Sequence, residues 1–269
     1  MKILGWNCRG LGNPQTVRAL RQLVKEEAPN ILFLFETKTN QTRMEFIKSQ
    51  IGFRNGVFVD SDGKSGGLCL LWQDPNLIQL QSFSKSHIDV LVGENSDSQW
   101  CLIGFYGSPD ASQRSISWAL LRSLRQQMDI PWLCLGDFNE ILCDSEKLGM
   151  RSRDECQMRD FRKVLDDCGF RDLGFYENRF TWCNRRDGEA NILERLDRAI
   201  ATTDWCQRFF RAKVFHLVSS ASDHSPIYVS LRPKRNYLQR RRANFFHFEP
   251  MWFRDENCGE VIRSSWQGG

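Results

Sequence analysis

The sequence predicts a protein of the α/β class, and two observations carry that prediction. Short apolar runs with the composition of buried β-strands alternate with segments whose apolar residues recur at helical spacing. The opening of the chain shows this order most plainly: a strand over 3–8, a helix beginning at Asn13-Pro14, and a strand over 31–35. Asn13 suits a helix cap and Pro14 the first helical position. A strand–helix–strand opening is typical of α/β sheets.

The remaining elements follow from the same two patterns. A short helix is expected over 44–51, and the next two strands are expected to form a hairpin across the polar turn Asp60-Ser61-Asp62-Gly63. Asp187-Gly188 favours a second hairpin, between 181–184 and 192–197. The other expected strands are 53–59, 66–72, 77–83, 88–92, 100–106, 132–135, 214–218 and 227–231, and the other expected helices are 117–128, 156–168 and, short and amphipathic, 205–210.

Composition places the chain among globular proteins. Its 269 residues suit one large domain or two small ones, and 41% hydrophobic with 26% charged residues is close to the globular average. No apolar run approaches the length of a membrane span, so no membrane partner is expected. The first residues lose their apolar character at once, so a signal peptide is not expected either.

The ten cysteines form no Cys-x-x-Cys pair and no zinc-like pairing with histidine. Several of them, such as Cys69, Cys101 and Cys134, lie inside strand-like runs, where cysteine behaves as a small apolar residue. We therefore expect reduced thiols and an intracellular protein.

The basic charge of the chain is concentrated at its end. Residues 232–269 hold eight Lys or Arg and four Asp or Glu, whereas the rest of the chain is balanced. We place a domain boundary there, with one domain over 1–231 and a basic, aromatic connector over 232–269. A block of like charge suits contact with a polyanion, and a solvated linker explains it equally well.

Five polar clusters each stand after an apolar run: Asn7, Glu36, Asp137 with Asn139, Asp197, and Asp223-His224. Each alone has an ordinary interpretation, because Asp, Asn and Gly are common turn formers. Five of them on alternating strands instead suggest side chains that converge at one edge of a sheet, where open α/β sheets place their ligands.

These clusters stand in six motifs that occur in the order found in the endonuclease/exonuclease/phosphatase superfamily, which the chain resembles over about residues 1–231. Within it, the chain resembles the apurinic-type endonuclease domain of plant LINE-type (non-LTR) retrotransposons, chiefly through the stretch from Phe180-Thr181-Trp182 to Arg198. The six motifs are Trp6-Asn7-Cys8-Arg9-Gly10, Glu36-Thr37-Lys38, Tyr106-Gly107-Ser108-Pro109, Gly136-Asp137-Phe138-Asn139, Arg195-Leu196-Asp197-Arg198 and Ser222-Asp223-His224.

A second stretch, 248–252 (Phe-Glu-Pro-Met-Trp), resembles the connector that leads to reverse transcriptase in those elements. A reverse transcriptase segment is expected downstream in a full-length element. No polymerase sequence follows here, so a fragment or a stand-alone copy is expected.

The resemblance implies a four-layer α+β (α/β) sandwich of two packed mixed β-sheets flanked by helices. It also implies phosphodiester hydrolysis that depends on Mg²⁺ or Mn²⁺, with Glu36 and Asn7 holding the metal. Asp137 would orient or deprotonate the attacking water, and Asn139 would fix the geometry of Asp137.

The resemblance gives roles to four further residues. His224 would neutralise charge that builds on the phosphate, Asp197 would orient that imidazole, and Asp223 would position metal or water. Tyr106 would donate to a phosphate oxygen. Each of these residues also has an alternative interpretation from its residue type alone. His224 could be a structural histidine, and Asp197 could form an ion pair with Arg195 or Arg198. Asp223 could cap a turn, and Tyr106 could be a core tyrosine.

One position departs from the resemblance. Many repair-type members carry an acidic residue two positions after the first-motif Asn, where this chain has Arg9. Metal affinity would then depend more on Glu36. Arg185 and Arg186, at the tip of the expected hairpin, would contact a phosphate backbone.

The function expected from the sequence is therefore that of an Mg²⁺-dependent endonuclease that nicks double-stranded DNA, with a nuclear location following from that substrate. Two alternatives remain open: a phosphatase of the same fold that acts on a small molecule, and a non-catalytic nucleic-acid-binding relic.

Overall fold

The computed structural model describes residues 1–63, 65–93, 98–150 and 152–233. The chain divides into two compact units, Met1–Arg232 and Pro233–Gly269, and every element below belongs to the first. Most of the expected connector, from residue 234 onward, lies outside the described residues.

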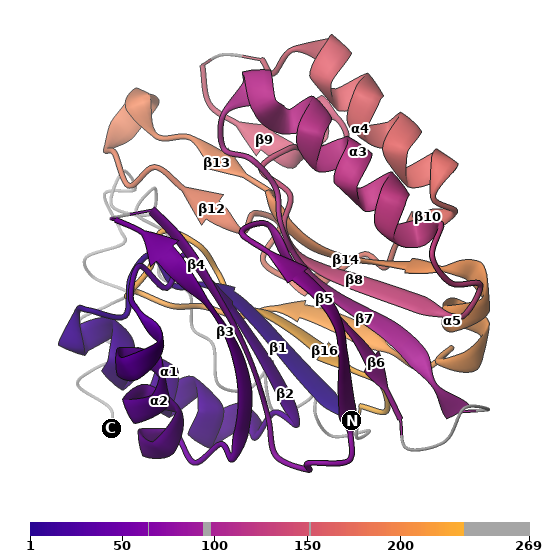
Figure 1. Cartoon of the computed structure of the whole chain (residues 1–269). Coiled ribbons are helices and arrows are strands. Elements are labelled where there is room, and N and C mark those ends of the chain that lie inside the picture. The colour runs from indigo at the N-terminus through magenta and orange to yellow at the C-terminus, as the bar shows by residue number, and fades with distance from the viewer. Residues whose placement is uncertain (64, 94–97, 151, 234–269) are drawn as a thin grey trace, which may run out of the picture. The chain divides into compact units, whose positions relative to one another are not determined.

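Two large mixed sheets pack against each other (Figure 1). The seven-stranded sheet has the order β11-β15-β16-β1-β2-β4-β3, and the six-stranded sheet has the order β10-β14-β8-β7-β6-β5. The strands of the first are β1 (Lys2–Asn7), β2 (Ile31–Phe35), β3 (Asn55–Asp62), β4 (Ser65–Trp72), β11 (Tyr176–Glu177), β15 (Lys213–His216) and β16 (Ile227–Ser230). Those of the second are β5 (Ile78–Ser84), β6 (His87–Val92), β7 (Trp100–Tyr106), β8 (Trp132–Asp137), β10 (Phe170–Asp172) and β14 (Asp197–Thr202). The seven-stranded sheet has two parallel pairs, β1 with β2 and β11 with β15, and the six-stranded sheet has one, β7 with β8; the other neighbours are antiparallel.

Strand β8 is buried on both faces, as its continuous apolar run predicts. Leu133 and Leu135 point into the core between the two sheets. Trp132 and Cys134 alternate with them and pack in a second core beneath two helices. The strand therefore lies in the middle of the molecule, and its carboxyl end is held from both sides.

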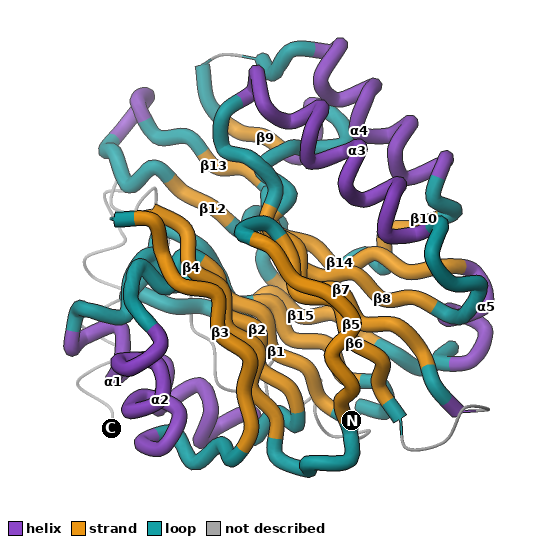
Figure 2. Tube along the Cα trace, viewed as in Figure 1, coloured by secondary structure: helices purple, strands orange, loops and turns teal. Residues whose placement is uncertain are grey.

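Helices cover the outer faces of both sheets (Figure 2), which gives four layers and confirms the expected fold class. Helices α1 (Pro14–Glu27) and α2 (Gln41–Gln50) lie on the seven-stranded sheet, and α3 (Arg114–Arg125) and α4 (Glu155–Asp167) lie on the six-stranded sheet. As expected, the Asn13 side chain caps α1 by accepting a hydrogen bond from the backbone of Gln15. Helix α5 (Thr203–Arg208) buries Trp205 at the end of the core between the sheets.

None of the helices in the described part of the chain has the combination of length and apolar character that crossing a membrane requires. The nine cysteines that the structure describes are all free, and five of them are buried.

The structure corrects two local expectations about turns. Asp60, Ser61 and Asp62 have turn-forming side chains, yet β3 continues through them, because Asp62 pairs with Ser65 across a tight hairpin. The second expected hairpin exists as β12 (Trp182–Cys183) and β13 (Leu193–Glu194), which form a three-stranded sheet with β9 (Lys147–Leu148). Its tip is a 3₁₀ turn over Gly188–Ala190, so Asp187-Gly188 does not form a two-residue turn.

Candidate active site

Four strand ends and one connecting segment meet at one edge of the packed sheets, where the sequence predicts that these side chains converge. Asp197 begins a strand, however, whereas the sequence predicts that it ends one. Asn7 ends β1 and Glu36 follows β2 in the seven-stranded sheet. Asp137 ends β8 in the six-stranded sheet, and Asp197 begins β14 directly opposite it in the strand register. His224 lies in the segment between β15 and β16. Residues from both sheets are thereby brought together, although up to 217 positions separate them in the chain.

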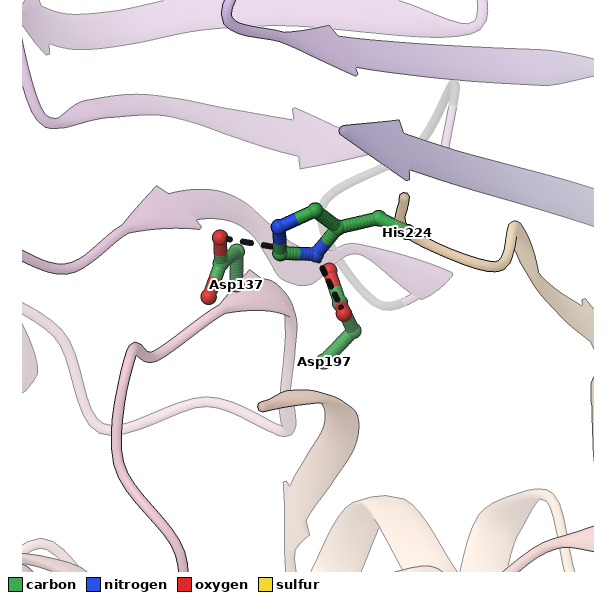
Figure 3. Close-up of side chains that lie close together, drawn as sticks. All are labelled: Asp137, Asp197 and His224. Carbon is green, nitrogen blue, oxygen red and sulfur yellow. Dashed lines mark hydrogen bonds and ion pairs between the residues drawn. The ribbon is translucent and has the colours of Figure 1, made fainter. Parts of the chain in front are cut away.

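His224 lies between two carboxylates (Figure 3). Its Nδ1 donates to Asp197 Oδ2 at 2.8 Å and lies 3.8 Å from Asp137 Oδ2. All three residues are at most 3% exposed. Burial would lower the pKa of His224, but the negative charges of Asp197 and then Asp137 outweigh it and raise that pKa. The ring is therefore held as a buried cation whose other nitrogen, Nε2, faces Asn7.

Asp137 is fixed by two neighbours. Its Oδ1 accepts the backbone N–H of Asn139 at 2.9 Å, and its Oδ2 accepts Asn7 Nδ2 at 2.9 Å. Burial, and next the negative charge of Asp197, raise the pKa of Asp137. A carboxylate with a raised pKa is a better proton acceptor near neutral pH than an exposed one.

Asn139 acts on Asp137 through its backbone, with a left-handed φ of 55°. Its side chain points elsewhere, because Nδ2 donates to the carbonyl of Gly107 at 2.8 Å. The strand end is also tight at Gly136, where a Cβ would lie 1.8 Å from the Phe105 carbonyl oxygen. Only glycine fits there, which is why the motif begins with it.

Glu36 receives donors from four side chains. Oε1 accepts from Asn7 Nδ2 at 3.1 Å and from the Tyr106 hydroxyl at 2.9 Å, and Lys38 Nζ lies 3.0 Å from Oε2. Arg9 Nη1 contacts both oxygens, at 3.1 and 3.2 Å. Burial would raise the pKa of Glu36, but the hydrogen bond from Asn7, the charge of Arg9 and the other donors lower it to about 2. Glu36 is therefore ionised throughout the physiological range.

Tyr106 is present at the site, but its hydroxyl hydrogen is already donated to Glu36. Burial, and then the charge of Glu36, raise the pKa of this phenol, so it stays protonated. Asp223 lies at the outer side of the cluster, where Oδ2 accepts Trp182 Nε1 at 3.1 Å and Oδ1 lies 3.3 Å from Arg9 Nε.

The oxygen-rich side of the site fits a divalent metal ion. Glu36 and Asp223 are carboxylates, and hard oxygen ligands suit Mg²⁺ and Mn²⁺. Asp137, Asp197 and His224 also lie within 4.8 Å of one another and form the one three-residue ligand group found among the described residues. A metal-bound histidine must be neutral, however, and the Nδ1 of His224 is engaged with Asp197, so this group suits a hydrogen-bonded chain better than a metal.

Arg195 and Arg198 do not pair with Asp197. Arg198 is fully buried and reaches Glu146 and Asp172, both at 2.7 Å, and Arg195 reaches the same two carboxylates at 2.7 and 2.8 Å. These four residues form one network of ion pairs, although the buried Nε of each arginine has no hydrogen-bond partner among the described residues. Asp197 pairs with His224 instead.

The two arginines of the hairpin differ in their surroundings. The Arg185 guanidinium donates to the backbone carbonyls of Ser220, at 2.9 Å, and Ser222, and so ties the hairpin to the segment that carries His224. Arg186 is exposed, and its side chain makes no hydrogen bond within the described residues. Within the described residues, neither arginine forms a hydrogen bond or ion pair with the cluster of Asn7, Glu36, Asp137, Asp197 and His224.

Three residues that position the site were not singled out from the sequence. Thr181 Oγ1 accepts the backbone N–H of Asp197 at 2.9 Å. Ser222 Oγ donates to the Asn7 carbonyl at 2.7 Å and accepts the His224 N–H at 3.1 Å. Trp6 Nε1 donates to the His224 carbonyl at 3.1 Å. All three stand inside the motifs that carry the resemblance, but their roles depend on long-range contacts.

Several solved structures share this fold, and the likeness is one of fold because sequence identity is low. A 3′-5′ exonuclease from Neisseria meningitidis is 19% identical, with a TM-score of 0.68 over 87% of this chain and 100% of that one. An AP endonuclease from Archaeoglobus fulgidus is 18% identical, with a TM-score of 0.66 over 86% and 98%. The endonuclease domain of TRAS1, a telomere-specific non-LTR retrotransposon, is 14% identical, with a TM-score of 0.62 over 87% and 99%.

No curated protein sequence matches the chain. The profile of one sequence family does, over residues 4–224, which contain every site residue described above. The chain therefore belongs to the Endonuclease/Exonuclease/phosphatase family.

Proposed function

We propose that this chain is a divalent-metal-dependent endonuclease that nicks double-stranded DNA for a non-LTR retroelement. One observation carries the proposal: Asn7 joins an ionised carboxylate, Glu36, to a buried proton acceptor, Asp137, next to the cationic His224. A metal ligand, a base and an electrophilic donor within one cluster are what hydrolysis of a phosphodiester requires.

The chain's own residues would activate the water and stabilise the charge that builds on the phosphate. Water attacks the phosphorus atom, and Asp137, held by Asn7 and the backbone of Asn139, orients that water and accepts its proton. The bond from phosphorus to the 3′ oxygen breaks, and that oxygen takes a proton from a solvent water, which leaves a 3′-hydroxyl and a 5′-phosphate. His224 donates from Nε2 to a phosphate oxygen as negative charge builds there, while Asp197 holds the ring through Nδ1.

A bound Mg²⁺ or Mn²⁺ would neutralise charge on the phosphate and the departing oxygen. Glu36 would hold it, with Asp223 beside it and Asn7 orienting the Glu36 carboxylate. Tyr106 would serve as a positioning residue for Glu36.

Three observations support DNA as the substrate. A 3′ phosphatase of this fold from Neisseria was solved with a product DNA hairpin, and the TRAS1 domain comes from a retrotransposon. Arg186 stands exposed at the tip of the small sheet, where a phosphate backbone could reach it. The proposal also includes a nuclear location and a reverse transcriptase segment downstream in the full-length element. It further includes a domain over 1–231 that is followed by a basic connector.

Supercoiled plasmid tests this function. The pure protein with Mg²⁺ or Mn²⁺ is expected to convert supercoiled plasmid to the open-circular form, and EDTA is expected to stop the conversion. Polymerase extension of the nick without prior end treatment reports the 3′-hydroxyl. Plasmid that stays intact with either metal contradicts the proposal: retained plasmid binding then identifies a relic, and hydrolysis of p-nitrophenyl phosphate alone identifies a phosphatase.

A further inference from the structure

We propose that the Arg9 guanidinium occupies the metal site when no metal is bound, so that a divalent ion binds only after it displaces the Arg9 side chain. The inference deepens the proposed function and rests on it for the existence of the ion. It makes no use of the nicking reaction itself.

Arg9 bridges two carboxylates that belong to different strand ends. Its Nη1 contacts both oxygens of Glu36, at 3.1 and 3.2 Å, and its Nε lies 3.3 Å from Asp223 Oδ1. The guanidinium therefore spans the gap between the two carboxylates suited to the ion. A divalent ion bound to both Glu36 and Asp223 would contact the same oxygen atoms that the guanidinium now contacts. The ion and the guanidinium therefore cannot occupy the site together.

Exposure shows which partner can move. The Arg9 side chain is 45% exposed, whereas those of Glu36 and Asp223 are 7% and 21% exposed. Asn7 and Tyr106 also hold Glu36 from its buried side. The carboxylates are thus fixed, and the arginine can swing into solvent without unpacking the core.

Electrostatics make the two states exclusive. A divalent ion and a guanidinium on the same carboxylate would repel each other, and the repulsion between near neighbours is strong when water is partly excluded. An ion must therefore replace a charge-assisted, hydrogen-bonded pair, which lowers its apparent affinity by the strength of that pair.

Lys38 provides a matched comparison. Its Nζ also lies close to Glu36, 3.0 Å from Oε2, and its side chain is 27% exposed. Among the described residues, Glu36 is the one carboxylate with which Lys38 Nζ forms an ion pair, and no pair with Asp223 is found. Removing Lys38 changes the charge near the ion, whereas removing Arg9 changes the charge and also vacates the space between the carboxylates.

The experiment measures Mn²⁺ binding without DNA, from the electron paramagnetic resonance signal of free Mn²⁺. Arg9→Ala is expected to tighten Mn²⁺ binding roughly 10- to 100-fold, which is the range for loss of a charge-assisted hydrogen bond. Lys38→Met is expected to tighten it by no more than about threefold, as a partly exposed single charge. Glu36→Gln is expected to abolish this binding in the wild-type and Arg9→Ala backgrounds, which locates the ion.

Two results would overturn the inference: Mn²⁺ affinity that Arg9→Ala leaves unchanged or weakens, and equal tightening by Arg9→Ala and Lys38→Met. Thermal unfolding of each variant confirms that it is folded. The plasmid assay separates this inference from the proposed function. If Arg9→Ala binds Mn²⁺ more tightly but no plasmid is nicked, the inference about Arg9 holds and the proposed function is wrong. If plasmid is nicked but Arg9→Ala leaves the Mn²⁺ affinity unchanged, the proposed function holds and the inference about Arg9 is wrong.

Discussion

Asp137→Asn is expected to slow plasmid nicking by about 10²- to 10⁴-fold, the usual contribution of a positioned general base. Asparagine keeps the size of the side chain and can still accept the Asn139 backbone N–H, but it cannot take a proton from water. The loss is expected in kcat, measured as the rate with saturating protein over plasmid, because the substitution leaves the DNA-facing surface unchanged.

Two controls separate chemistry from folding in this prediction. Asp160→Asn changes an exposed carboxylate on α4 in the same way and is expected to leave nicking unchanged. The thermal midpoint of Asp137→Asn is not expected to fall, because burial and the charge of Asp197 already disfavour the ionised form of Asp137. An Asp137→Asn protein that nicks within tenfold of the wild type would remove Asp137 from its assigned role.

The second large effect concerns stability. Arg198→Met is expected to lower the free energy of unfolding by about 3–5 kcal/mol, because it leaves the buried Glu146 and the partly buried Asp172 without one of their cations. Arg198 is fully buried and its ion pairs with Glu146 and Asp172 are both 2.7 Å long. Urea denaturation followed by tryptophan fluorescence measures the change.

An exposed ion pair supplies the control for Arg198. Arg122 pairs with Asp167 at 2.8 Å, but the two side chains are 35% and 40% exposed. Arg122→Met is expected to cost less than about 1 kcal/mol. Equal losses in the two variants would mean that burial of the Arg198 network does not determine its contribution.

The strand ends could be predicted from the sequence because their signals are local. The run from Trp132 to Leu135, then Gly136 and Asp137, marks a buried strand that stops at a polar residue, and the structure places that residue at the site. The same local pattern placed Asn7 and Glu36. Helical stripes likewise identified α3 and α4, and the structure shows that both pack on the six-stranded sheet.

Hydrogen-bond partners could not be predicted in this way, because they depend on contacts between distant segments. Tyr106 was expected to face a phosphate, yet its hydroxyl reaches Glu36, 70 positions away in sequence. Arg185 was expected to face DNA, and it binds two backbone carbonyls instead. The short strands β9, β10 and β11 have two or three residues each, which is too few for a periodicity to show.

The central claim is that strand ends from two sheets act as one catalytic unit, and the coupling between Asp197 and His224 tests it most directly. The measurement is the nicking rate of Asp197→Asn, His224→Gln and the double variant. If Asp197 acts through the imidazole, which it meets at 2.8 Å, each single change is expected to cost at least about 100-fold, and the double variant is expected to lie within about threefold of His224→Gln. Losses that multiply in the double variant would contradict the account, because the two residues would then act independently.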